Sequence, residues 1–327
     1  MVGATDSRAK RKIGNMDLVF CGTPQFAVPT LRVLAEKGHR IRLVITQPDR
    51  PSGRGMELTF SPVKQLALKL DLPIVQPEKI KTNAEFRVQL EAIRPEAIIV
   101  VGYGRIIPQW MIDLPPLGNL NLHASLLPKY RGAAPIQWAI ANGEKITGVT
   151  TMRIDAGLDT GDILLQQEIV ILAEDTALTL GPKLSEIGAE LMAQSLDGLR
   201  EGTIIPQKQD EQHASFAPIL NKEDGLIDFR RKAIDIWNRM RGFQPWPGVF
   251  TSFRGKKLTI TAARPSEGAG LRLVEGEVAV NSGQLLVGFA GNTQLELLEV
   301  QPEGKKRMPA KDFLNGYRPQ PGEKLGS

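Results

Sequence analysis

N-L-N-L-H-A-S-L-L-P-K-Y-R-G-A-A-P-I-Q-W, from Asn119 to Trp138, is the stretch that decides the predicted fold. Its first residues alternate between polar and apolar, which is typical of a strand, and side chains two apart on a strand point to one face. Asn121 and His123 therefore emerge side by side, just before the turn signal at Leu127. In an open parallel sheet, ligands bind at the carboxyl ends of the strands. An amide beside a titratable ring at that place suits a reaction that develops negative charge on a carbonyl oxygen.

A histidine on a strand is also compatible with a core residue whose ring nitrogens are hydrogen-bonded. A second segment favours the catalytic interpretation, because residues 155–163 read D-A-G-L-D-T-G-D-I. This acidic loop is punctuated by glycines and runs into an apolar segment. Such a loop can bring a carboxylate back to the strand that carries His123.

The segments that precede this stretch alternate between strand and helix patterns. An apolar run at 17–21 leads into a helical pattern that ends at Gly38, and a second apolar run follows at 41–45. This order predicts a parallel, doubly wound sheet. The continuous apolar run at 96–101 is typical of a central strand that is covered on both faces. No G-x-G-x-x-G fingerprint follows the first strand, which disfavours a dinucleotide site.

The segments that follow the stretch change in character along the chain. Residues 149–153 read as a strand, and the apolar spacing across 180–191 predicts a long amphipathic helix that closes a first domain. Residues 202–224 have no sustained period and read as a linker. A short helix is expected at 233–240. Short alternating runs separated by turn signals then predict a small β-barrel; they lie at 257–260, 277–280, 284–287 and 294–297.

Several motifs together resemble the folate-dependent formyltransferases. They are N-L-H-x-S-L-L-P-x-Y-R-G-x-x-P and D-x-G-x-D-T-G-D-I, with F-C-G-T-P-Q-F, T-Q-P-D-R-P-S-G-R-G and Q-P-W-P-G elsewhere in the chain. The resemblance extends over nearly the whole chain from Met16. It implies an α/β protein with a Rossmann-like formyltransferase domain at 16–203, a linker at 204–223 and a smaller OB-like β-barrel domain at 224–327.

The resemblance also implies a reaction and its site. The reaction moves a formyl group from 10-formyltetrahydrofolate to the α-amine of methionine esterified to initiator tRNA. Asn121 and His123 are expected to donate hydrogen bonds to the tetrahedral oxyanion, and Asp159 is expected to support the charged form of His123. The expected folate contacts are the turn Ser125, Leu126, Leu127 and Pro128, together with the strand-end residues Gly102, Tyr103 and Gly104.

A polyanionic partner is expected from two features. The long connection 46–61 carries Arg50 and Arg54 among prolines and glycines, and the resemblance implies that this loop enters the acceptor stem of the tRNA. Where this chain has Met56 and Glu57, the family often has lysines. This difference weakens the electrostatic argument that the loop binds tRNA, but it does not affect the match of Arg54 to the family arginine. From residue 222 onward 17 basic residues face 12 acidic ones, which accounts for the whole net charge of +5. The cluster Lys305, Lys306 and Arg307 is the expected phosphate contact in this region.

The composition sets further expectations. One cysteine, Cys21, and three histidines leave little material for a metal site, and no metal is expected. A single cysteine cannot form an internal disulfide, which fits the reducing cytoplasm. No apolar run approaches the ~20 residues that a membrane helix needs. Residues 1–15 read as a disordered extension, and the protein is expected to act as a monomer.

Rival interpretations differ in acceptor or in class. The same chemistry would serve an enzyme that formylates an amino-sugar nucleotide or glycinamide ribonucleotide, or one that hydrolyses the folate. A non-catalytic RNA-binding module built on the barrel is the rival of a different class. The polar set Asn121, His123 and Asp159 disfavours that module, because an RNA binder does not need an oxyanion site.

Overall fold

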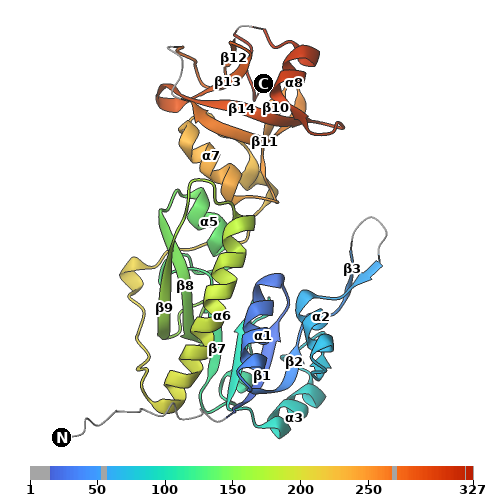
Figure 1. Ribbon diagram of the computed structural model, residues 1–327, viewed down its shortest axis with the longest axis vertical. Coiled ribbons are helices and arrows are strands. Elements are labelled where there is room, and N and C mark those ends of the chain that lie inside the picture. Colours follow the sequence, from blue (N-terminus) through green and yellow to red (C-terminus); the bar gives the residue numbers. More distant parts are fainter. Residues whose placement is uncertain (1–14, 53–56, 267–270, 321, 327) are drawn as a thin grey trace, which may run out of the picture. The chain divides into compact units, whose positions relative to one another are not determined.

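A computed structural model describes residues 15–52, 57–266, 271–320 and 322–326 of the chain. Over these residues the protein is an α/β protein with a seven-stranded sheet, a six-stranded sheet and a two-stranded hairpin (Figure 1). The chain divides into two compact units. The first combines the described residues of Met1–His123, Thr150–Gln166 and Ser185–Lys208, and the second those of Ala124–Val149, Gln167–Leu184 and Gln209–Ser327.

The seven-stranded sheet has the order β5-β2-β1-β6-β7-β8-β9. Its strands are β1 (Asp17–Gly22), β2 (Arg40–Ile45), β5 (Ile74–Val75), β6 (Ala97–Val101), β7 (Asn119–His123), β8 (Ile146–Arg153) and β9 (Ile163–Val170). Every pair from β5 to β7 is parallel, as predicted for β1, β2, β6 and β7, whereas the short strand β5 was not predicted. The pair β7 and β8 is antiparallel, so the sheet is mixed and the prediction of a parallel sheet was wrong at this edge. The reason is that β8 starts beside the end of β7, with Thr150 opposite His123.

Helices cover both faces of this sheet, as a doubly wound arrangement requires. In chain order the helices and short 3-10 turns are η1 (Gln25–Ala27), α1 (Val28–Glu36), α2 (Pro62–Lys69), α3 (Ala84–Ile93), α4 (Gln109–Ile112), α5 (Pro135–Ala141), α6 (Ala177–Glu201), η2 (Glu211–His213), η3 (Lys222–Gly225), α7 (Ala233–Gly242), η4 (Ala290–Asn292) and α8 (Ala310–Tyr317). The predicted long helix is α6. It approaches β7 so closely that a Cβ on Gly188 would lie 2.6 Å from the side chain of Leu122.

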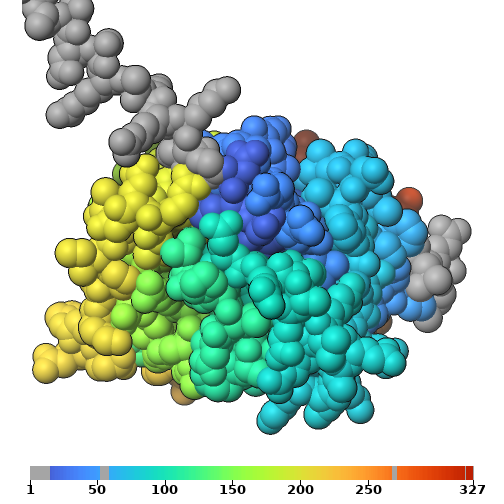
Figure 2. Space-filling model, turned by 90° about the horizontal axis from the view of Figure 1, so that it is seen from below, coloured from blue at the N-terminus to red at the C-terminus, as the bar shows by residue number. Residues whose placement is uncertain are grey.

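Helices α1 and α6 lie against each other. Ion pairs join Arg32 to Glu186 and Lys37 to Glu190, and Figure 2 shows the blue N-terminal segments beside the yellow end of α6. On the other face, α3 and α4 contribute to an apolar cluster with alternate residues of the central strands. Cys21 belongs to this cluster and is fully buried, and burial raises the pKa of its thiol above the ordinary value. The single cysteine is therefore a core residue.

The long connection that was predicted between residues 46 and 61 contains a small hairpin. Strands β3 (Arg50–Ser52) and β4 (Glu57–Thr59) pair antiparallel, with Arg50 opposite Thr59. This hairpin was not predicted, because a ladder of three residues is too short to produce an alternating pattern. A hydrogen bond of 2.8 Å between the hydroxyls of Thr46 and Ser61 joins the two ends of the connection.

The six-stranded sheet is antiparallel and lies in the second unit, in the part of the chain for which a small β-barrel was predicted. Its strands are β10 (Val249–Phe253), β11 (Lys256–Ser266), β12 (Val278–Asn281), β13 (Gln284–Phe289), β14 (Thr293–Pro302) and β15 (Met308–Pro309). Strands β10 and β15 and helix α8 were not predicted. Apolar residues of the strands pack with one face of α7 and with Phe313 of α8 to form the core.

Candidate active site

One face of β7 carries three polar side chains in a row. Asn119, Asn121 and His123 alternate with leucines that face the other way, so the predicted pairing of the amide and the imidazole on one face follows from the strand. The Nδ2 atom of Asn119 donates to the carbonyls of Met111 and Ile112, at 2.8 and 3.1 Å. Asn119 thus fastens the strand to the end of α4. Sequence reasoning missed this residue, although it stands in the same alternating run.

The predicted carboxylate lies beside the predicted imidazole. The Nδ1 atom of His123 is 3.6 Å from Oδ2 of Asp159, and the two side chains are 6% and 17% exposed. This distance is within reach of an ion pair but longer than a hydrogen bond. Distances of this kind in enzymes often shorten when substrate binds. The ring of His123 is buried, whereas the carboxylate of Asp159 is partly exposed.

The loop that carries Asp159 does not start near His123. Arg153 lies opposite Leu120, and the amide of Ile154 donates to the carbonyl of Asn119, so the chain leaves β8 beside the beginning of β7. Three residues of strand, roughly 10 Å, separate that point from His123. The loop therefore folds back along the strand to bring its carboxylate to the ring. The antiparallel entry of β8, which the sequence did not predict, creates this geometry.

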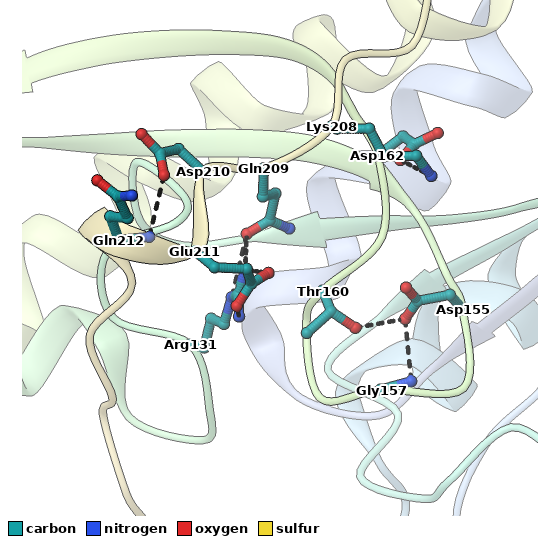
Figure 3. A network of polar contacts seen from close by, with 10 residues as sticks. All are labelled: Arg131, Asp155, Gly157, Thr160, Asp162, Lys208, Gln209, Asp210, Glu211 and Gln212. Atoms are coloured by element: carbon teal, nitrogen blue, oxygen red, sulfur yellow. Dashed lines mark hydrogen bonds and ion pairs between the residues drawn. The ribbon is translucent and has the colours of Figure 1, made fainter.

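Glycines give this loop its tight path (Figure 3). A Cβ on Gly161 would lie 1.8 Å from the carbonyl oxygen of Arg153, and one on Gly157, which Figure 3 shows in the loop beside Thr160, would lie 2.0 Å from the hydroxyl of Thr160. The end of the loop is held by an ion pair of 2.8 Å between Asp162 and the exposed Lys208. The glycines of the D-A-G-L-D-T-G-D segment are thus required by close backbone contacts.

An open cleft in the first unit brings together residues from three parts of the sequence. Its lining consists of Thr23, Pro24, Gln47, Pro48, Arg50, Thr59, Phe60, Ser61, Pro62, Gly104 and Arg105. Two predicted site residues, Arg50 and Gly104, therefore share one cleft. Arg54 lies outside the described residues. The described lining contains two guanidinium groups and no carboxylate, so the cleft favours an anionic ligand.

The strand-end motif Gly102-Tyr103-Gly104 contributes backbone to this region. Both glycines have positive φ, 56° and 75°, which explains the residue type. The ring of Tyr103 lies in the core, where burial raises the pKa of its hydroxyl above the ordinary value. The carbonyl of Tyr103 accepts a hydrogen bond of 3.0 Å from Nε2 of Gln47. Of the three residues of this motif, Gly104 is the one that lines the cleft.

A polar network below the cleft was not predicted from the sequence. Lys64 donates to Asp49 and, at 2.7 Å, to Gln76, while Gln76 donates to Asp49 and to the carbonyl of Gln47. The hydrogen bond from Lys64 lowers the pKa of Asp49. Arg105 donates to the side chain of Gln47 at 2.9 Å. The network ties the base of the β3–β4 hairpin to the strand ends.

The turn at 125–128 has a fixed shape of its own. Ser125 is fully buried and its hydroxyl donates to the carbonyl of Lys129 at 2.6 Å. Leu127 is buried and is followed by a cis bond to Pro128, whereas Leu126 and Pro128 are partly exposed. Of the four predicted contact residues, the last two named offer side-chain surface.

The arginine of the same Y-R-G segment has a structural partner. Arg131 is buried, and its guanidinium donates to the side chains of Gln209 and Glu211, with distances from 2.8 to 3.1 Å (Figure 3). These hydrogen bonds lower the pKa of Glu211. Part of the predicted linker is thereby fixed to the turn that follows β7.

The predicted basic cluster lies on an exposed turn of the second unit. Lys305, Lys306 and Arg307 follow β14 and are all exposed. The amide of Glu303 donates to the carbonyl of Lys257, so the exposed Lys256 and Lys257 are close to the same turn. Sequence reasoning missed these two lysines, because the antiparallel pairing of β11 with β14 brings them there. We call the five cations the basic turn.

The described residues contain no candidate metal site and no candidate membrane-spanning helix. No group of three or more histidine, cysteine, aspartate or glutamate side chains among them could hold a metal ion. Within the same residues no helix has the length and apolar character needed to cross a membrane.

Comparison with known proteins identifies the family. The model of the formyl transferase family matches residues 16–196, and that of the formyl transferase C-terminal domain matches residues 219–318. The chain therefore belongs to the formyl transferase family and is a transferase, as the motifs predicted. It is 64% identical to the methionyl-tRNA formyltransferase of Koribacter versatilis over 95% of this chain and 99% of the relative. It is 61% identical to that of Acidobacterium capsulatum over 95% of this chain and all of the relative.

Solved structures share the fold at low sequence identity. An N-formyltransferase from Helicobacter canadensis, solved with folinic acid and dTDP-3-aminofucose, is 19% identical with a TM-score of 0.65, covering 88% of this chain and 99% of its own. HypX from Aquifex aeolicus, solved with tetrahydrofolic acid, is 18% identical with a TM-score of 0.61, covering 95% of this chain and 49% of its own. These likenesses support the α/β architecture.

Proposed function

We propose that this chain transfers the formyl group of 10-formyltetrahydrofolate to the α-amine of methionyl initiator tRNA. The observation that carries the proposal is the 3.6 Å approach of Asp159 to the buried ring of His123, which shares one face of β7 with Asn121. The relatives at 64% and 61% identity, each matched over nearly its full length, support the acceptor. The proposal assigns residues 16–203 to catalysis and 224–327 to tRNA binding.

The chemistry follows from charge development on the formyl oxygen. The neutral amine attacks the formyl carbon, and the carbonyl oxygen becomes an oxyanion. The side-chain amide of Asn121 and a ring N–H of His123 donate to that oxygen, and such donors are each worth ~2.7–4 kcal/mol in other acyl-transfer sites. The carboxylate of Asp159 stabilises the charged ring. The intermediate then releases tetrahydrofolate, whose nitrogen gains a proton, while the amine loses one through water held by Asp159.

We assign the binding of the formyl donor, the folate, to main-chain atoms at the ends of the strands and to the turn after β7. The nearest atom to a Cβ built on Gly104 would be Nε2 of Gln47 at 3.8 Å, so a flat ligand can approach the main chain of Gly104. A Cβ on Gly102 would collide with Pro24 at 2.7 Å, which restricts that position to glycine. Leu126 and Pro128 offer apolar surface in the turn after β7. We assign the folate to these residues.

The acceptor side is assigned to cationic surfaces. Arg50 and Arg105 line the cleft of the first unit, and the basic turn lies in the second unit. Phosphates of a tRNA acceptor strand suit the cleft, and phosphates elsewhere in the tRNA suit the basic turn. Because charged tRNA is used in translation, we place the enzyme in the cytoplasm, acting as a monomer.

The test is acceptor choice. Purified protein with 10-formyltetrahydrofolate is given methionyl initiator tRNA, an amino-sugar nucleotide or water alone, and formylated product is measured in single turnover. We expect formylated product with methionyl initiator tRNA and none with the amino-sugar nucleotide or with water. Preferential formylation of the sugar nucleotide, or release of formate without an acceptor, would replace the proposed substrate. Binding of tRNA without any transfer would favour the RNA-binding module.

A further inference from the structure

The loop that carries Asp159 is largely exposed, so no packed apolar core holds its first residues in place. Residues 155–158 are all exposed, and Leu158 leaves 61% of its surface in solvent. Asp159 itself has φ of 53°, a left-handed conformation that is uncommon for residues other than glycine. The loop also has to run back from the start of β7 to His123. Apolar packing therefore does little to fix the first half of this loop, residues 155–158.

The side chain of Asp155 is the hub of the loop (Figure 3). Its Oδ1 atom accepts a hydrogen bond of 3.0 Å from the amide of Gly157 and one of 2.7 Å from the hydroxyl of Thr160. The first bond closes a tight turn at the start of the loop. The second holds the residue that directly follows Asp159. One oxygen atom thus fastens the chain on both sides of the carboxylate that meets His123.

The next residue completes the restraint. Gly161 approaches the carbonyl of Arg153 so closely that no side chain fits there. Thr160 is therefore held between a hydrogen bond from its own side chain and a backbone contact of its neighbour. With both in place, the peptide of Asp159 has little freedom to rotate away from the ring.

We infer that Asp155 and Thr160 are positioning residues, which set the distance between Asp159 and His123 through a hydrogen-bonded clamp on the exposed loop. The inference rests on the proposed function for its effect on catalysis, but the geometry it describes is independent of the substrate. The clamp acts through hydrogen bonds to Oδ1 of Asp155 and needs no charge on that residue. Misplacement of a reacting group by ~1 Å costs about 100-fold in rate, so loss of the clamp should be visible.

Substitutions at two positions separate positioning from other roles. Asp155→Asn keeps an oxygen that accepts both hydrogen bonds, and Thr160→Ser keeps the hydroxyl; both should retain activity within about threefold of the unaltered protein. Asp155→Ala and Thr160→Val remove the clamp and should lower kcat by about 10- to 100-fold with KM for tRNA unchanged. If Asp155→Asn is as damaging as Asp155→Ala, charge and not the clamp is responsible, and the inference is overturned.

A double-mutant cycle tests whether the clamp acts through Asp159. In an Asp159→Asn background, Thr160→Val should have little further effect on kcat, because the group it positions is already altered. Additive losses would mean that Thr160 acts independently of Asp159 and would contradict the inference. Equal melting temperatures for Thr160→Val and Thr160→Ser would exclude general destabilisation as the cause.

A spectroscopic readout does not depend on the reaction. The chain has only three histidines, so nitrogen resonances of His39, His123 and His213 can be resolved in protein with labelled histidine. Thr160→Val should shift the ring resonances of His123 alone, and Thr160→Ser should leave them unchanged. An unmoved His123 in Thr160→Val would overturn the inference even if formyl transfer were not the activity.

A matched control lies in another loop. Asp210 also accepts from an amide two residues ahead, that of Gln212 at 3.0 Å (Figure 3). It contacts the ring of His213 at 2.8 Å. Asp210→Ala should shift the resonances of His213, leave those of His123 in place and preserve kcat. Loss of activity in Asp210→Ala equal to that in Asp155→Ala would show that any broken surface turn has this effect, and would contradict a specific clamp.

Discussion

The polar face of β7 and the basic turn of the second unit differ in how far their side chains are buried and in how closely the positions of those side chains are fixed. His123 and Asp159 are nearly buried and meet at a single distance, 3.6 Å, set by strand register and a folded-back loop. The five cations of the basic turn are exposed and lie on flexible side chains. Chemistry on a carbonyl needs donors at fixed positions, whereas attraction to a polyanion depends on the sum of charges. Single substitutions should therefore be severe in the first region and mild in the second.

The base of the β3–β4 hairpin lies between these extremes. Lys64 and Asp49 form a hydrogen-bonded ion pair whose side chains are 15% and 18% exposed. Both side chains are mostly buried, and the pair joins the hairpin base to α2, so we expect it to contribute to stability. The three regions form a series in burial, and each can be tested by the size of the effect when a side chain is removed.

The largest effect is expected on the face of β7. Asn121→Ala and His123→Ala, made separately, should each slow single-turnover formyl transfer by about 100- to 1,000-fold, or ~2.7–4 kcal/mol, since each removes a donor to the oxyanion. Binding of folate and of tRNA, measured by fluorescence titration, should change little. If the rate of formyl transfer falls by less than about tenfold in both variants, the two side chains are not oxyanion donors, and the face of β7 is no more sensitive to substitution than the basic turn.

A smaller effect on stability is expected at the hairpin base. Asp49→Asn should lower the free energy of unfolding by about 1–2 kcal/mol at pH 7, because the hydrogen bond from Lys64 to a carboxylate is lost. The pKa of Asp49 is lowered in the folded protein, so its stabilisation is complete above the unfolded pKa of about 3.9 and is lost as pH falls through the lower folded value. Urea unfolding at pH 7 and pH 3.5 measures this, and the difference between the two proteins should shrink at the lower pH.

Asp71→Asn is the control for this prediction. Asp71 is exposed and has φ of 54°, which asparagine also adopts readily. It should unfold like the unaltered protein at both pH values. A pH-independent loss in Asp49→Asn would mean that packing, and not the charge of Asp49, is responsible.

At the basic turn we expect each cation to contribute a small part of the affinity for tRNA. Replacement of Lys305, Lys306 and Arg307 by alanine should raise KM for tRNA with kcat unchanged, and reduce the slope of log affinity against log salt by about 1 for each lost phosphate contact. The matched control replaces the exposed Lys69, Lys79 and Lys81 of the first unit, which changes net charge equally. Equal slopes in the two triple variants would show that only overall charge matters.

The smallest effect is expected at an exposed ion pair. Arg32 and Glu186 are 44% and 57% exposed, although their atoms are 2.8 Å apart. Arg32→Ala should change the free energy of unfolding by about 0–1 kcal/mol and leave transfer unaffected, because water and salt screen the pair. A loss above that of Asp49→Asn would break the relation between burial and effect.

Much of the first unit could be predicted because its signals are local. Apolar runs gave the central strands, the spacing across 180–191 gave α6, and alternation placed Asn121 and His123 on one face of β7. The motif residues also sufficed to predict the family. The β3–β4 hairpin and helix α8 were missed, since a ladder of three residues and a helix of eight leave little periodic signal.

The amino-acid sequence by itself determined which side chains are available for chemistry, because residue type and the two-residue repeat of a strand are local properties. Only the tertiary structure decided that β8 runs antiparallel to β7, that the following loop folds back to place Asp159 beside His123, and that Lys256 and Lys257 join the basic turn. These contacts join residues far apart in the chain. Their geometry depends on strand pairing and on the direction of each connection, which no local pattern specifies.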